Sequence, residues 1–191
     1  YTGARSSADI EHNGLTLDAV GNGTIIENIY VPFGSDDAIE FFGGTVNVTN
    51  FLAVDPDDDM FDVTQGWKGK LKNAYGIWKP GYASTESDPR GVESDGNFDG
   101  LGPDHVGQSD FIMENITIVN SSAYVMEDAI KIRRGAKATI INALVKSGAT
   151  KDFVDLTDSK GAGNPGSAVS VTNSNMTISS NFNRTHKFLF K

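Results

Sequence analysis

Asp37-Ala38-Ile39-Glu40-Phe41 is one copy of a five-residue segment that recurs along the chain. In each copy the apolar residues fall at alternate positions, which is the period of a β-strand. The copies begin at positions 13, 37, 59, 90, 128 and 152, so the spacings are 24, 22, 31, 38 and 24 residues. A repeat with a minimal period of about 22 to 24 residues and two insertions is typical of a solenoid.

A second repeated segment begins with asparagine and continues with alternating apolar residues. Glycines separate the two kinds of segment, as turns require. A coil of about 22 residues with two or three short strands, stacked on the next coil at ~4.8 Å, has the geometry of a parallel β-helix. We therefore expect an all-β solenoid of about six to seven turns. We also expect the asparagines to stack as an inward-facing ladder at a bend. They are Asn28, Asn50, Asn73, Asn115, Asn142 and Asn175.

Aligning the copies of the first segment predicts which side chains face the core. Since alternate residues of a strand point to opposite sides, the positions between the apolar residues should face solvent. The two inward columns are Leu15, Ile39, Phe61, Val92, Ile130 and Val154, and Leu17, Phe41, Val63, Ser94, Ile132 and Leu156. The outward column is Thr16, Glu40, Asp62, Glu93, Lys131 and Asp155.

The composition excludes several classes of protein. The 191 residues include 25 Asp plus Glu against 16 Lys plus Arg, a net charge of -9, which disfavours nucleic acid and suits divalent cations. There is no cysteine, so neither disulfides nor thiolate sites can form. No apolar run approaches the ~20 residues of a membrane-spanning helix. Because the chain begins at Tyr1, we expect either that a targeting segment was removed or that this is part of a longer protein.

The chain also resembles a known group of proteins. The residues that carry the likeness include the run 36–47, Gly66-Trp67-Lys68-Gly69-Lys70, and Arg90-Gly91-Val92-Glu93-Ser94-Asp95. Over about residues 10–150 the sequence resembles secreted bacterial right-handed β-helix proteins of the pectin-lyase-like superfamily, most of which lack an assigned activity. The resemblance implies a right-handed parallel β-helix in an extracellular or cell-surface setting. The wider superfamily includes pectate, chondroitinase-like and alginate lyases and polygalacturonases, but a shared fold does not transfer their chemistry.

The expected domain is a single β-helix over residues 1–191, with insertions near 79–89 and 95–108. Two acidic stretches predict Ca²⁺ as a cofactor. In the first, Asp95, Asn97 and Asp99 match the first half of a calcium loop, although Val106 takes the closing position that glutamate should hold. In the second, carboxylates crowd together at Asp55, Asp57 and Asp59.

Three functions remain open at this stage. A polysaccharide lyase acting on uronate polymers could use Lys131 as base and Arg133 as charge neutraliser, with Glu93 beside them. Ladder ion pairs with Glu93, Asp95 and Asp155 would explain the same residues without catalysis. A polygalacturonase-like hydrolase could use the Asp36-Asp37 and Asp58-Asp59 pairs, although that family's Gly-His-Gly element is missing.

The third function is a binding or structural module, and it is the one that we favour. Amphipathic aromatic side chains near acidic loops suit sugar stacking, and Trp67, Trp78 and Tyr82 are the candidates. We expect an extracellular, calcium-stabilised β-helix that binds acidic polysaccharide or another surface protein. Its open ends would also allow copies to associate end to end. An unpaired Lys131 in a cleft would favour the enzyme, and ion pairs on a flat face would favour the module.

Overall fold

Two stacks of parallel strands make up most of the described part of the protein. The computed structural model describes residues 3–7, 10–96 and 105–156, and the backbone of 175–179. One stack, the short-strand sheet, contains β1 (Leu15–Asp18), β3 (Ile39–Phe42), β5 (Phe61–Thr64), β7 (Val92–Asp95) and β10 (Ile130–Arg133) in that order. Each comes from one copy of the five-residue segment, so the predicted strands are confirmed.

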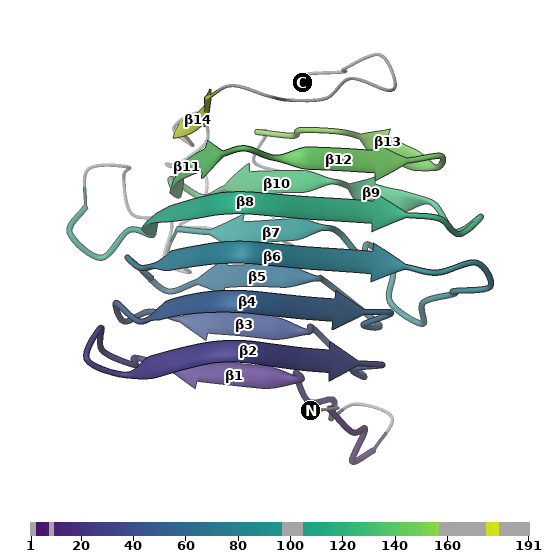
Figure 1. Cartoon of the computed structure of the whole chain (residues 1–191), viewed down its shortest axis with the longest axis horizontal. Coiled ribbons are helices and arrows are strands. Elements are labelled where there is room, and N and C mark those ends of the chain that lie inside the picture. Colours follow the sequence, from purple (N-terminus) through teal and green to yellow (C-terminus); the bar gives the residue numbers. More distant parts are fainter. Residues whose placement is uncertain (1–2, 8–9, 97–104, 157–174, 180–191) are drawn as a thin grey trace, which may run out of the picture.

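The other stack, the long-strand sheet, is formed by the asparagine-containing segments. Its order is β14 (Asn175–Ser179), β11 (Lys137–Ile141), β8 (Asp110–Asn120), β6 (Lys70–Trp78), β4 (Asn47–Val54) and β2 (Ile25–Pro32), and β12 (Leu144–Ser147) also pairs with β8. A small third sheet pairs β9 (Met126–Asp128) with β13 (Thr150–Asp152). Figure 1 shows the coils rising from β1 and β2 near the N-terminus, with the two sheets facing each other. This architecture is the predicted parallel β-helix.

The register between coils is also the predicted one. Leu15 pairs with Ile39, Phe61 pairs with Val92, and Val92 pairs with Ile130. The inward positions from β3 to β10 are buried, and they meet the apolar residues of the long strands in one core. Aromatic rings stack along the core axis, with the centroids of Phe41 and Trp67 3.8 Å apart.

The asparagine ladder exists, but it faces outward rather than inward. Asn50 Nδ2 donates to Asn28 Oδ1 at 2.9 Å, and the same bond recurs at 3.0, 2.9 and 3.0 Å through Asn73, Asn115 and Asn142. All five side chains are exposed. The reason lies in the backbone, since each of these residues has a φ between 54° and 60°.

That left-handed conformation changes the alternation within the strand. Val48 and Phe51 are both buried although they are three residues apart, and Asn50 takes up the extra position on the outside. The effect is that of a bulge, which bends the strand and returns the following residue to the core. Asparagine tolerates this conformation better than most residues.

The ladder predicts a difference between two substitutions at Asn73. We expect Asn73→Ala to lower the free energy of unfolding by about 2 kcal/mol, because alanine is strained at this φ and the ladder bonds are lost. Asn73→Gly should lose less, since glycine adopts the conformation without strain. Denaturant unfolding of both variants measures the difference, and equal losses would contradict a role for the left-handed backbone.

Candidate functional site

The outer face of the short-strand sheet carries the charged columns of the protein. Along one column Glu40 pairs in register with Asp62, Asp62 with Glu93, and Glu93 with Lys131. The column is acidic on the first coils and includes basic residues on the later coils, so we distinguish two regions of this face. The first coils form the acidic face, which consists of Asp36, Asp37, Glu40, Asp58, Asp59 and Asp62. The later coils form the ion-paired face, which consists of Arg90, Glu93, Asp95, Lys131, Arg133 and Asp155.

The ion-paired face contains the three residues considered for catalysis. Lys131 is 1% exposed, and its Nζ donates to Asp155 Oδ2 at 2.7 Å. Arg133 donates to Glu93 Oε2 and to Asp95 Oδ1, both at 2.5 Å. The expectation that Lys131 faces solvent is therefore wrong, because its amine lies along the sheet on the carboxylate of the next coil. The arrangement is the ladder of ion pairs that favours a module over a lysine base.

The acidic face has little such compensation. Asp37 and Asp59 are 5% and 3% exposed. Each accepts a hydrogen bond from the backbone of the next coil: Asp59 N donates to Asp37 Oδ1 at 3.0 Å, and Arg90 N donates to Asp59 Oδ1 at 2.6 Å. Their oxygens also belong to overlapping triads in which all three ligand atoms lie within 4.8 Å of one another. No ion pair between described residues involves Asp36, Asp37, Glu40, Asp58 or Asp62. The triads are Asp36–Asp37–Asp58, Asp37–Glu40–Asp62 and Asp59–Asp62–Glu93.

Burial shifts the acid–base behaviour of this face. Desolvation, with like charge from Glu93, Asp88, Glu86 and Asp36, raises the pKa of Asp58 to about 8. Desolvation also raises the pKa values of Asp37, Asp59 and Asp62 well above their ordinary range. Carboxylates this close must share protons or a cation to coexist in a folded chain.

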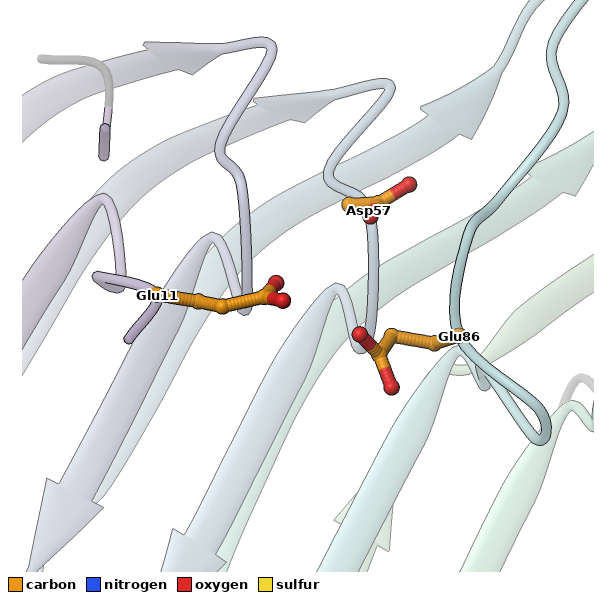
Figure 2. Close-up of side chains that lie close together, drawn as sticks. All are labelled: Glu11, Asp57 and Glu86. Carbon is orange, nitrogen blue, oxygen red and sulfur yellow. The ribbon is translucent and has the colours of Figure 1, made fainter. Parts of the chain in front are cut away.

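A further group of carboxylates lies at the turns beside the acidic face. Glu11, Asp57 and Glu86 come from three separate segments, as Figure 2 shows, and one carboxylate oxygen of each lies within 4.8 Å of the others. We call them the turn triad. Arg5 Nη2 pairs with Glu11 at 2.6 Å and lies 3.6 Å from Asp57, so a single cation faces three carboxylates. The sequence did not indicate this group, because its members lie on three different coils.

Among the described residues, two buried carboxylate oxygens accept no hydrogen bond. They are Glu11 Oε2, in the turn triad, and Asp58 Oδ1, in the Asp36–Asp37–Asp58 triad. A buried acceptor without a donor is costly, and it marks a place where an ion or proton can bind. The carboxylate oxygens of both triads therefore fit a hard divalent cation such as Ca²⁺.

The predicted calcium ligands do not come together. Asp55 pairs with Lys79 at 3.0 Å, Asp57 belongs to the turn triad, and Asp59 lies in a triad with Asp62 and Glu93. No group of carboxylate oxygens within 4.8 Å of one another joins Asp55, Asp57 and Asp59 among the described residues, so these three do not form one site. The carboxylate of Asp95 is held by Arg133 and by Arg134 at 2.9 Å. Asn97 and Asp99 lie outside the described residues.

The two tryptophans expected to bind sugar belong to the core. Trp67 and Trp78 are both 0% exposed, so neither ring has a face open to a ligand. Trp67 Nε1 donates to Val46 O at 3.1 Å, and Trp78 stacks on Tyr82 with centroids 4.5 Å apart. Tyr82 is half-buried, and its hydroxyl donates to Pro56 O at 2.8 Å. The pattern of aromatic residues alone could not distinguish core from surface here.

An open groove of about 730 Å³ lies over the turns next to the turn triad. Tyr82, Asp55 and Asp57, which the sequence indicated, contribute to it together with residues that the sequence did not indicate. Chief among these is Phe33, which is 59% exposed. The lining is Arg5, Phe33, Gly34, Ser35, Asp55, Asp57, Lys79, Pro80, Gly81, Tyr82, Ala83 and Thr85.

The raised pKa of Asp58 predicts how stability depends on pH. A group whose pKa is higher in the folded protein binds protons more tightly there, so the stability that it contributes is lost as pH rises. In chelator, Asp58 alone should lower the free energy of unfolding by up to about 1.4 kcal/mol per pH unit as pH rises from its ordinary pKa of 3.8 to its raised value of about 8, and the other carboxylates with raised pKa values add to this fall. Asp58→Asn should flatten this slope, and the exposed control Asp18→Asn should not. Equal slopes for all three proteins would contradict the prediction.

In the part of the chain that the structure describes, no helix is long and apolar enough to cross a membrane.

Comparison with known proteins agrees with the β-helix architecture. No curated protein and no solved structure matches the chain significantly. Residues 1–188 match the family described as pectate-lyase like beta helix domain, a match that spans both charged faces and the turn triad. The chain therefore belongs to the pectate-lyase-like β-helix domain family.

Proposed function

We propose that this protein is a calcium-binding β-helix module that holds acidic glycans through its carboxylate-rich side. The observation that carries the proposal is the pair of buried, unpartnered oxygens, Glu11 Oε2 and Asp58 Oδ1, each within a carboxylate triad. Both triads lie at the turns that lead into the short-strand sheet, so they would bind cations on one side of the rod.

Calcium suits these groups better than a transition metal. It takes six to eight oxygen ligands in flexible geometry and completes its shell with water. Cysteine is missing, and the three carboxylates of the turn triad are partly buried rather than fully enclosed. Arg5 would supply part of the neutralising charge in the absence of the ion. A bound calcium would compete with Arg5 for Glu11 and Asp57.

An acidic glycan is the ligand class that follows from an exposed bound cation. Calcium held by only three carboxylates retains open coordination positions, and the carboxylate of a uronic acid could fill one of them. The family is carbohydrate-related, which supports a sugar ligand over other anions. A module that binds such polymers would act outside the cell or at its surface, and the resemblance to secreted bacterial proteins supports this part of the proposal. A role within a surface assembly is compatible with the same site.

The alternative, a uronate lyase, has weaker support. Its base would be Lys131, which is buried and donates to Asp155. Arg133, its charge neutraliser, is held by Glu93 and Asp95. Both side chains therefore connect neighbouring coils through ion pairs, and the buried amine of Lys131 has no surface open to a substrate.

Thermal unfolding in chelator and in excess calcium tests the proposal. Since an ion that binds only the folded state stabilises it by RT ln(1 + [L]/Kd), calcium at 100 times its Kd should add about 2.7 kcal/mol to the free energy of unfolding. Glu86→Gln should lose a substantial part of this gain, because it removes one carboxylate of the turn triad. The two triads could each contribute, so the loss is partial.

Glu27→Gln is the matched control, since it makes the same change at an exposed position on β2. It should retain the full calcium response. Oligouronates should then bind in calcium and be released by chelator, without cleavage products. An unfolding curve that is the same in calcium and chelator would refute the calcium site, and the accumulation of unsaturated products would favour the lyase.

A further inference from the structure

Phe33 lies on the surface in a conformation that phenylalanine seldom adopts. It is 59% exposed, and its φ is 57°, in the left-handed region. That region is strained for bulky side chains, and such strain is concentrated at functional sites. Neither burial nor backbone preference therefore accounts for an aromatic residue at this position.

The equivalent residue of the next coil shows what the turn itself requires. Asp55 also has a left-handed φ, of 50°, and its Oδ1 accepts Lys79 N at 2.7 Å. Phe33 and Asp55 begin their turns in the same way, since Phe33 N donates to Val54 O and Asp55 N to Ile77 O. A polar side chain thus supports this turn, whereas the ring of Phe33 can make no such bond. The fold therefore does not require an aromatic ring at position 33.

The surroundings of Phe33 match the chemistry of an acidic sugar. The ring lines the open groove, with Lys79 Nζ 4.6 Å from its centroid. The hydroxyls of Ser35 and Thr85 line the same groove, as does Asp57 of the turn triad. One groove therefore combines an aromatic face, an ammonium group, hydroxyls and a carboxylate of the candidate calcium site.

We propose that Phe33 is the stacking platform for a uronic acid residue of the glycan. The apolar face of the pyranose ring packs on the phenyl ring, and the sugar carboxylate competes with Asp55 for Lys79 and approaches calcium at the turn triad. The groove volume of about 730 Å³ lies within the range of small-molecule sites. The inference deepens the proposed function and rests on it, because the ligand class comes from the cation site.

The test uses a second exposed aromatic residue as its control. Tyr30 is 51% exposed and lies on β2, and it is not among the residues that line the groove. Calorimetric titrations would use trimers of galacturonate, guluronate and glucuronate in calcium, and the methyl ester of any trimer that binds. We expect Phe33→Ala to weaken the binding of the acidic trimer at least tenfold, and Tyr30→Ala to change it less than twofold. The methyl ester should bind more weakly than the free acid.

Phe33→Gly separates binding from folding. Glycine adopts the left-handed conformation without strain, so its melting temperature should equal or exceed that of the wild type while trimer binding is lost. Binding by Phe33→Ala and Phe33→Gly that equals the wild type, or loss only in Tyr30→Ala, would overturn the groove site and leave the proposed function standing. If calcium stabilises the protein and no trimer binds, both the glycan function and this inference fail. If calcium has no effect either, the cation proposal fails with them.

Discussion

Stacking of one coil directly on the next is the constraint on which the rest of this structure depends. Parallel strands separated by ~4.8 Å bring equivalent residues of successive coils into contact. Rows of like residues are favourable when they are apolar, as in the core, or when each can donate to the next, as in the asparagine ladder. Rows of like charge are unfavourable unless something compensates them.

The outer face of the short-strand sheet deals with repulsion between stacked charges in two different ways. On the later coils, basic residues enter the rows, and Lys131 and Arg133 pair with carboxylates of neighbouring coils. Removal of one partner from such a pair would strongly destabilise the protein, because the other charge would remain buried without compensation. On the first coils the carboxylates stack on one another instead, with raised pKa values at Asp58 and Asp62. Divalent cations would turn this unfavourable row into a binding surface, and that is why function is proposed there.

Sequence reasoning was most successful where the repeat itself carries the information. The period of alternation and the spacing of the copies predicted the strands and their register, from Leu15 over Ile39 onward. It failed at the orientation of Asn50, because the left-handed residue shifts the alternation by one position, so that Val48 and Phe51 both face the core although they are three residues apart. The prediction that Trp67 stacks on a sugar was wrong, because the local sequence does not distinguish a tryptophan ring in the core from one on the surface. The turn triad could not be predicted from the sequence either, because the path of the 79–89 insertion determines where Glu86 lies.

A crystal structure of the protein grown in saturating calcium, with anomalous scattering data recorded for the ion, tests the central claim most directly. We expect an anomalous peak bound by Glu11, Asp57 and Glu86, with calcium–oxygen distances of about 2.3–2.6 Å. We also expect Arg5 to have moved away from Glu11. An ion pair between Arg5 and Glu11 that persists in saturating calcium, with no peak at the turn triad or the acidic face, would contradict the claim.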